Sequence, residues 1–348
     1  MRVVTTLPQQ DLRLVPNASK AAENAGYDGL ITMENRNNPF LAHAVAAIST
    51  DKVELATAIA IAFARSPMSV ANISWDLQIA SRGRFVLGIG PQVKAHNERR
   101  FSVPWTPPVP RLREYVNALR AIWTSWEKGS RLNFEGEHYK FTLMTPAFVP
   151  ESMGLRMVPI RLGAVGEHSL RLAGEVADGV LLHPFCTRKY LELQVLPRLS
   201  EGLAKNTKSL DNFEINGGGF IATGKDEDEV QNMFEWIRER IAFYGSTPAY
   251  WPVMEVHELG ELGKTLNTLS KEGKWKEMTK LITDDIVHLF TAVGTHKEIV
   301  GEIEKHFGGI SNCISASPNA SIPAELPPDL IRDIQKIPSR FQGFKTGW

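Results

Sequence analysis

The sequence predicts an α/β fold, a (β/α)8 TIM barrel, and three observations lead to this prediction. Short apolar segments typical of strands alternate with amphipathic helical patterns along the 348 residues. The segments 53–61 and 85–89 are almost continuously apolar, as strands buried on both faces of a parallel sheet are. The number of such segments favours a closed barrel over a doubly wound sheet. The predicted strands are Arg2–Leu7, Gly29–Met33, Val53–Ile61, Arg84–Gly90, Pro159–Ala164, Gly179–His183, Phe213–Thr223 and Asn312–Ala316.

The segments between these strands carry helix-start signals. Ser66 followed by Pro67 predicts an N-cap and a first helical residue, ahead of an apolar stripe at 70, 73, 77 and 80. Thr295 and Glu298 have the spacing of a capping box and precede the last helix of the predicted barrel.

Residues 1–348 are expected to form one domain with two insertions. A typical barrel of this kind has ~250 residues, which leaves roughly 100 for insertions. The first insertion is placed after strand 4, at about 101–158, and contains a proline-rich stretch, a helix and a hairpin-like segment. The second, at about 245–289, precedes the last helix and is interpreted as extra helix on the rim or a lid.

Composition narrows the range of partners. The chain is 43% hydrophobic, and its 39 Lys and Arg balance its 39 Asp and Glu, so no nucleic acid and no membrane partner is expected. Neither a signal peptide nor an apolar run of ~18 residues is present, and the expected location is cytoplasmic. The 9 histidines and 2 cysteines have no metal-ligand spacing, so no metal site is expected. Serine hydrolase and P-loop motifs are absent from the sequence.

Two glycine motifs follow predicted strands. Residues 88–93 begin like a dinucleotide fingerprint, but Val93 stands where the third glycine is needed. These small residues let a cofactor approach the backbone, or they form a tight turn that binds nothing. Residues 163–169 lead into a helix whose N-terminal amides attract phosphate, although Glu167 has the wrong sign unless it points away. The alternative for this segment is an ordinary short loop.

Two polar residues at strand ends are the catalytic candidates. Glu34 follows the second strand and would lie at the catalytic face of a barrel, where a carboxylate can bind a cofactor or donate a proton. The alternative is a helix-start charge. His183 ends the sixth predicted strand and is a candidate acid or base. Its alternative is a half-buried, hydrogen-bonded histidine.

Several segments, in the expected order, resemble the luciferase-like monooxygenase superfamily, and within it the coenzyme F420-dependent oxidoreductase branch. They are residues 27–34, 55–67 with its Arg-x-Pro ending, 81–90 with Gly-Arg-Phe-Val-Leu-Gly-x-Gly, and 173–179. The resemblance implies a barrel with the cofactor ring over its mouth and a non-proline cis peptide, Ala58-Ile59, backing the ring. It also implies hydride transfer between a deazaflavin and a small-molecule substrate, and a homodimer.

The resemblance further implies a set of cofactor contacts. These are Glu34, Ala58, Ile59, Ala60, Gly90, Pro91, Gln92, Asn97, Ala164, Val165, Gly166, Glu167 and His168. One departure concerns the pair after the second strand, where relatives resembling sugar-phosphate dehydrogenases carry Asp-His and this chain carries Glu34-Asn35. No substrate is carried over for that reason. Trp105, Trp251 and Phe63 are considered as lining of an apolar substrate pocket, or as core residues.

Three alternatives remain open from the sequence. An FMN-dependent luciferase-like monooxygenase would use the same barrel and most of the same contacts. A non-catalytic flavin- or deazaflavin-binding protein is compatible with the missing Asp-His pair. A phosphate-binding isomerase or aldolase would need a placed base, and Lys94 is the lysine that the sequence places near a strand end.

Overall fold

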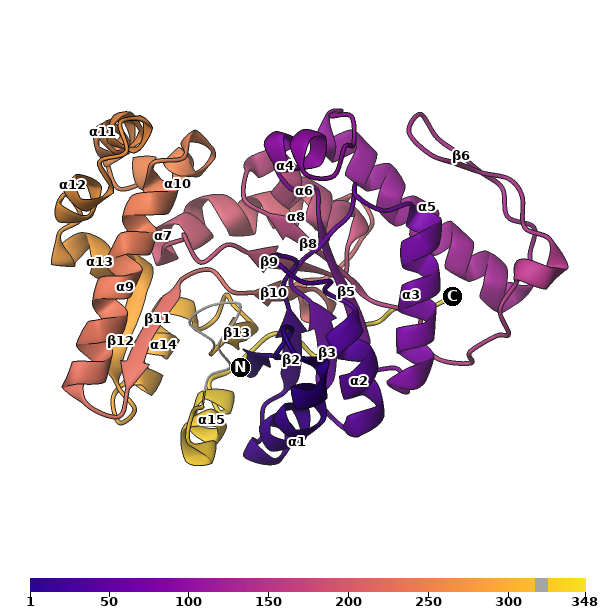
Figure 1. Cartoon of the computed structure of the whole chain (residues 1–348), viewed down its shortest axis with the longest axis horizontal. Coiled ribbons are helices and arrows are strands. Elements are labelled where there is room, and N and C mark those ends of the chain that lie inside the picture. Colours follow the sequence, from indigo (N-terminus) through magenta and orange to yellow (C-terminus); the bar gives the residue numbers. More distant parts are fainter. Residues whose placement is uncertain (317–324) are drawn as a thin grey trace.

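The computed structural model describes residues 1–316 and 325–348, and it contains the predicted barrel (Figure 1). All strand pairs of the barrel are parallel, and the pairing of residues 54–57 with residues 85–90 closes it. The strands in barrel order are β1 (Arg2–Thr6), β2 (Gly29–Thr32), β3 (Glu54–Thr57) continued by β4 (Ala60–Ile61), β5 (Phe85–Gly90), β8 (Ile160–Ala164), β9 (Gly179–Leu182), β10 (Glu214–Asn216) and β13 (Cys313–Ser315).

Helices surround this barrel (Figure 1). The Ser66 hydroxyl accepts the Met68 N–H at 3.3 Å, so the predicted N-cap is confirmed. The Glu298 carboxylate accepts the N–H (3.2 Å) and the hydroxyl (2.7 Å) of Thr295, just ahead of the last barrel helix. The helices are α1 (Val15–Ala25), α2 (Leu41–Ser49), α3 (Pro67–Ala80), α4 (Lys94–Arg99), α5 (Pro108–Lys128), α6 (Glu167–Val176), α7 (Arg188–Tyr190), α8 (Leu196–Ala204), α14 (Ile299–Phe307) and α15 (Pro328–Gln335).

The prediction of one strand over Phe213–Thr223 is wrong. β10 ends at Asn216, and Gly217 and Gly218, with φ of 84° and 110°, turn the chain out of the barrel. The next strand, β11 (Phe220–Gly224), pairs in parallel with β12 (Thr291–Thr295), which was not predicted, and the two form a separate small sheet. The run Gly217-Gly218-Gly219 is a turn signal in the sequence, and the single predicted strand passed over it.

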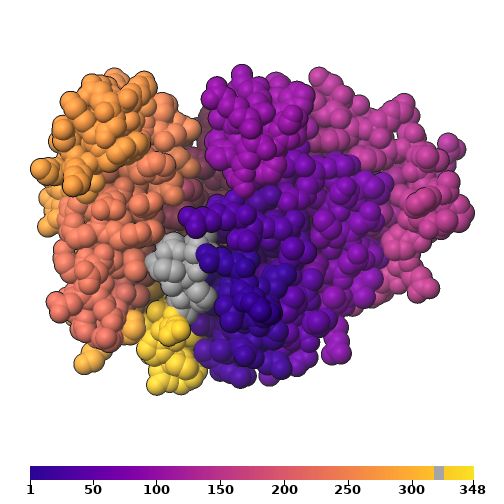
Figure 2. Space-filling view, viewed as in Figure 1, coloured from indigo at the N-terminus to yellow at the C-terminus, as the bar shows by residue number. Residues whose placement is uncertain are grey.

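A helical insertion lies between β11 and β12, and includes the predicted second insertion. It stands beside the barrel, and the surface is indented between this insertion (orange) and the segment after β5 (purple) (Figures 1 and 2). Its helices are α9 (Glu227–Gly245), α10 (Trp251–Glu255), α11 (Gly260–Lys271), α12 (Trp275–Lys280) and α13 (Asp284–Phe290). Within the described residues, no helix combines the length and apolarity needed to cross a membrane.

The first insertion contains the expected helix, α5, and a hairpin of β6 (Phe134–Glu135) and β7 (Lys140–Phe141) that projects from the barrel (Figure 1). Glu114, Glu137 and His138 bring potential metal-ligand atoms within 4.8 Å of one another. The Glu114 carboxylate, however, accepts the backbone N–H groups of Glu137 (3.1 Å) and His138 (2.8 Å). The cluster is therefore explained by capping of the hairpin.

Charged side chains fill the N-terminal end of the barrel. Arg2 pairs with Glu54 (3.1 Å) and Glu214 (2.6 Å), and the buried Arg161 pairs with the same two carboxylates. The Phe344 ring, from the C-terminal segment, lies 5.3 Å from the Arg161 guanidinium. The charges at this end of the barrel are thus balanced, although a pocket lined by Arg2, Glu54 and Phe344 remains there. In barrels of this kind the site is expected at the C-terminal end.

The barrel interior depends on close contact between β3 and β5. The Thr57 hydroxyl donates to Gly88 O (2.7 Å) and accepts the Gly88 N–H (2.9 Å). A Cβ at position 88 would lie 1.8 Å from Thr57 O. Because that oxygen belongs to the backbone of a neighbouring strand, it cannot move aside at low cost.

Gly88→Ala is expected to lower the free energy of unfolding by about 3 kcal/mol or more, as severe overpacking does. Gly301→Ala in α14 is the control, because a Cβ there meets nothing within 4 Å. Alanine at this helical position should raise stability by about 0.5–1 kcal/mol. Urea unfolding followed by circular dichroism measures both, and equal stabilities of Gly88→Ala and wild type would contradict the packing described.

A buried histidine links α2 to the barrel. His43 Nε2 lies 2.8 Å from the Thr32 hydroxyl and 3.0 Å from Ala56 O. Since the Thr32 hydroxyl donates to Pro39 O, and Ala56 O only accepts, the ring carries its proton on Nε2. Burial lowers the pKa of His43 from 6.5 to about 3.

This lowered pKa predicts acid sensitivity. Below pH 6.5 the unfolded chain binds a proton at His43 and the folded chain does not, so folding stability falls as pH falls towards about 3. The expected loss is about 1.4 kcal/mol per pH unit in this window. Replacing His43 by Gln should reduce the slope of stability against pH, in urea unfolding measured from pH 7 to 4, by up to about 1.4 kcal/mol per pH unit. The slope that remains comes from other groups whose pKa is also lowered, among them His183. His168→Gln, at a side chain 75% exposed, should keep the full slope, and an unchanged slope in His43→Gln would refute the assignment.

Candidate functional site

The third barrel position is interrupted between β3 and β4, and the Ala58–Ile59 peptide bond there is cis, as the resemblance implied. The Ile59 side chain lies between β5 and β8. A Cβ at Gly90 would be 3.2 Å from Ile59 Cδ1, and one at Gly163 would be 3.2 Å from Ile59 Cγ2. Packing around Ile59 therefore accounts for the small residues at both strand ends, which form an apolar surface at the barrel mouth.

Glu34 holds this interrupted strand in place. Its carboxylate accepts the Ile61 N–H at 2.7 Å, and the Arg65 guanidinium donates to both carboxylate oxygens at 2.7 and 2.8 Å. The Glu34 N–H donates to Ile59 O at 3.2 Å. The side chains of Glu34 and Arg65 are only 6% and 17% exposed. Both oxygens of Glu34 are thus engaged by protein donors, in the geometry that makes Arg–carboxylate pairs strong.

The loop after β5 is fixed by a buried side chain. Asn97 is fully buried, and its amide nitrogen donates to Pro91 O (2.9 Å) and Val93 O (3.1 Å). Gln92 has a left-handed φ of 60° and accepts the Val93 N–H with its own side chain at 2.8 Å. Asn97 Oδ1 is buried without a hydrogen-bond partner among the described residues. In this arrangement Asn97 positions the loop.

The loop after β8 leads into α6 with its first amides free. The first bond of this turn runs from Leu170 N to Gly166 O (3.0 Å), and the N–H groups of residues 167–169 donate to no described residue. Glu167 points to Arg171 (3.4 Å) and Arg198 (3.6 Å), which offset its charge. Both arginines pair more closely with Glu201, at 2.5 and 2.6 Å, so the two arginines and two glutamates form one charge-balanced cluster.

His183 lies just beyond β9, with its ring near two tyrosines. Its Nδ1 accepts the Phe185 N–H at 3.0 Å, so a neutral ring carries its proton on Nε2. Burial lowers the pKa of His183 to about 4. The ring centroids of Tyr244 and Tyr250 lie 4.4 and 4.8 Å from it. The imidazole is therefore neutral at neutral pH.

All the predicted site residues follow the C-terminal ends of barrel strands, but they form separate groups. In one group, Glu34 is hydrogen-bonded to Ile59. In a second, Gly90 and Gly163 pack against Ile59. In a third, Asn97 is hydrogen-bonded to the loop after β5. Glu34 follows β2 and His183 follows β9, and in the order β2-β3-β5-β8-β9 these strands face each other across the barrel. Glu34 and His183 are therefore not one acid–base pair.

Sequence reasoning gave no individual role to several residues around the mouth. Arg65 belongs to the Arg-x-Pro motif, yet its partner Glu34 is 31 residues away, which no local pattern reveals. Tyr244 and Tyr250 belong to the helical insertion. Trp251 instead donates its indole N–H to Gly245 O (3.1 Å) inside that insertion. Phe63 is buried, and the Arg111 guanidinium lies over it, 4.3 Å from the centroid of the Phe63 ring. Trp105 is half-buried.

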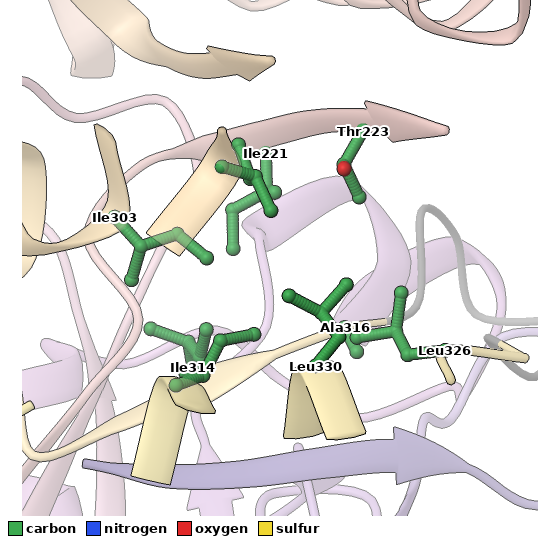
Figure 3. Close-up of a pocket in the computed structure, with 9 residues that line it drawn as sticks. Ile221, Thr223, Ile303, Ile314, Ala316, Leu326 and Leu330 are labelled. Atoms are coloured by element: carbon green, nitrogen blue, oxygen red, sulfur yellow. The ribbon is translucent and has the colours of Figure 1, made fainter. Parts of the chain in front are cut away.

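A pocket elsewhere in the molecule lacks catalytic groups. It lies between β11, α14, β13 and α15 and has no charged lining residue (Figure 3). Its lining residues are Ile221, Thr223, Ile299, Ile303, Ile314, Ala316, Leu326, Leu330 and Ile334. This composition is that of an apolar packing defect.

Two relatives match nearly the whole chain. An uncharacterized protein of Mycobacterium tuberculosis is 44% identical over 305 residues, which cover 88% of this chain and 89% of the relative. A 5,10-methylenetetrahydromethanopterin reductase of Archaeoglobus fulgidus is 29% identical over 328 residues, 91% of each chain.

Solved structures share the fold. The coenzyme F420-dependent tetrahydromethanopterin reductase from Methanopyrus kandleri superimposes with a TM-score of 0.75 at 21% identity, covering 97% of both chains. The oxygenating component of 3,6-diketocamphane monooxygenase from Pseudomonas putida, in complex with FMN, gives 0.65 at 14% identity, covering 96% of this chain and 97% of the other.

Glu34→Gln should lower the free energy of unfolding by about 2–3 kcal/mol, because it leaves the Arg65 charge without its bidentate partner. The effect is set below that of a fully buried pair because Arg65 is 17% exposed. Glu135→Gln is the control, since its pair with Lys140 is exposed and should contribute within about 0.5 kcal/mol. Guanidinium unfolding of both variants checks this, and similar losses would contradict a special role for Glu34.

The family model of the luciferase-like monooxygenases matches residues 2–310, nearly the whole span of the barrel described above. The relative with 44% identity covers a similar extent. The chain belongs to the luciferase-like monooxygenase family.

Proposed function

We propose that this chain is an oxidoreductase that binds coenzyme F420 at the barrel mouth and transfers a hydride between this deazaflavin and an organic substrate. The observation that carries the proposal is the course of β8. Gly163 lies against Ile59, and Gly166 starts α6 three residues later. An apolar platform and an open helix N-terminus are thus separated by about 10 Å of extended chain, which suits a flat ring and a phosphate joined by a short linker.

The residues present fit the phosphate end of such a cofactor. The free N–H groups of residues 167–169 point along the helix dipole, which favours an anion. The charge of Glu167 would be offset, because it belongs to a balanced cluster with Arg171, Arg198 and Glu201. Asn97 would keep the loop at Pro91–Val93 beside the site.

Ile59 would support the ring. Its side chain is wedged between β5 and β8, so it presents a fixed apolar surface that would cover one face and exclude water from it. Glu34 would act indirectly, since both its oxygens are held by Arg65 and Ile61 and none is free to transfer a proton. We assign it to positioning the strand that carries Ile59.

When bound, the deazaflavin would supply two-electron hydride chemistry. The protein would orient the ring over Ile59 and leave its other face open to the substrate. His183, on the far side of the mouth, is neutral and can donate a hydrogen bond from Nε2. It would therefore orient a substrate acceptor atom at neutral pH rather than act as a charged acid.

The relatives support this choice of cofactor and reaction. The Archaeoglobus fulgidus relative, which aligns with 91% of this chain, is a reductase. The Methanopyrus kandleri structure is that of an F420-dependent reductase. The FMN-bound monooxygenase shares the barrel at lower identity, so FMN is the competing cofactor in the test.

Titration of the purified protein with coenzyme F420 and, separately, with FMN should give saturable anisotropy of F420 fluorescence and much weaker binding of FMN. We expect this order of affinities because the site is proposed to bind a deazaflavin. Tight binding of FMN together with no response to F420 would overturn the choice of cofactor. Binding of F420 without its reduction or oxidation by any alcohol, aldehyde or enone tested would favour a carrier protein.

Gly166 offers a direct test of the phosphate site. A Cβ at this N-cap meets nothing within 4 Å, and both Asp and Asn are favourable N-caps, so the fold should tolerate either. Gly166→Asp should weaken F420 binding about tenfold or more relative to Gly166→Asn, because its carboxylate repels the phosphate. Equal affinities of the two variants, measured by the same titration, would place the phosphate elsewhere.

A further inference from the structure

His183 follows directly after β9, the strand whose Leu181 side chain points into the barrel interior. Leu181 points inwards, because its Cδ1 lies 2.8 Å from the position that a Cβ on Gly88 of β5 would take. His183 is the first residue after this strand, so it lies nearer the mouth than Leu181 does.

Two tyrosines from the helical insertion complete an aromatic cluster with His183. Tyr244 comes from the end of α9, and Tyr250 from the 3-10 turn Pro248–Tyr250. Their ring centroids lie 5.7 Å apart, and the His183 ring lies within 4.8 Å of both. The buried Phe185 ring lies 5.6 Å from Tyr250, which anchors the cluster. The insertion thus contributes directly to the edge of the barrel mouth.

The polar atoms of this cluster are neutral, and apart from His183 Nδ1 none of them is bonded to another described residue. His183 Nδ1 is occupied by the Phe185 N–H, which leaves Nε2–H as its donor. Neither this nitrogen nor the hydroxyls of Tyr244 and Tyr250 has a hydrogen-bond partner in residues 1–316 and 325–348. Burial raises the pKa of Tyr250 to about 12 and also raises that of Tyr244. Three neutral donors are therefore available on aromatic walls.

The charges around the cluster do not suit an ionic ligand. Arg240 is the charged group that acts on Tyr244. Its side chain is 40% exposed and lies 3.9 Å from Glu239, and its Nε is buried without a hydrogen-bond partner among the described residues. A carboxylate or an ammonium group held between the rings would lose hydration without gaining a buried partner of opposite charge. A carbonyl or a ring nitrogen would instead satisfy the neutral donors, and the ring walls favour a flat molecule.

We infer that His183, Tyr244 and Tyr250 form the substrate-binding wall of the site, and that the substrate is an uncharged, planar molecule with a carbonyl or ring-nitrogen acceptor. The inference rests on the proposed function, because that function places the cofactor ring at the same barrel mouth. The wall selects substrate by flatness and by lack of charge, and it acts in binding.

Three probes with related skeletons test this selectivity. Cinnamamide is planar and neutral, cinnamate carries a charge on the same skeleton, and 3-cyclohexylpropanamide is neutral but not planar. Each is titrated into the F420-loaded protein and its dissociation constant is measured by ligand-observed NMR. Cinnamamide should bind about tenfold more tightly than either of the others. Tighter or equal binding of cinnamate, or no binding of any probe at its solubility limit, overturns the inference.

Variants locate the binding wall. Tyr244→Phe and Tyr250→Phe keep both rings and remove one hydroxyl each, so each should weaken cinnamamide binding about fivefold and leave F420 affinity unchanged. Tyr139→Phe removes a tyrosine hydroxyl outside the cluster, one that accepts the Arg111 Nε–H at 3.0 Å in the first insertion, and this control should change neither affinity. Unchanged cinnamamide affinity in both variants contradicts the assignment.

The two proposals fail in different ways. F420 binding with no discrimination among the probes refutes the substrate wall and leaves the proposed function in place. Absence of F420 binding refutes the proposed function, and the same probe titrations on the cofactor-free protein then decide whether the aromatic wall binds neutral planar molecules on its own.

Discussion

The buried pair between Glu34 and Arg65 is the constraint on which the barrel mouth depends. Glu34, which follows β2, accepts the N–H of Ile61 and so links β2 to the break between β3 and β4. Arg65 holds the Glu34 carboxylate through two hydrogen bonds, one to each oxygen. This arrangement holds Ile59 where it fills the space above Gly90 and Gly163. A charged pair thus shapes an apolar surface, and the polar groups that remain free lie elsewhere around the rim.

In the proposed function, those free groups give the mouth two sides. The amides at the start of α6 are open and unopposed, because the charge of Glu167 is balanced by Arg171 and Arg198. Across the strands, His183 faces the tyrosines of the helical insertion. The anion-binding side and the neutral aromatic side are what a cofactor with a phosphate and an uncharged substrate would each require.

The barrel and the family were predictable from the sequence because they depend on local patterns. Strands buried on both faces are continuous apolar runs, and Ser66-Pro67 marks a helix start by itself. The break after Asn216 carries a turn signal, because Gly217, Gly218 and Gly219 follow one another, but the single predicted strand ran across these glycines into β11. The contact of Glu34 with Arg65, and of His183 with Tyr244, joins residues distant in sequence, so only tertiary packing reveals it.

A crystal structure of the protein with coenzyme F420 is the most direct measurement of the central claim. The proposal requires density for the deazaflavin ring against Ile59 and for its phosphate within hydrogen-bonding distance of the amides of residues 167–169. A cofactor bound away from Ile59, or with its phosphate remote from the start of α6, would contradict it.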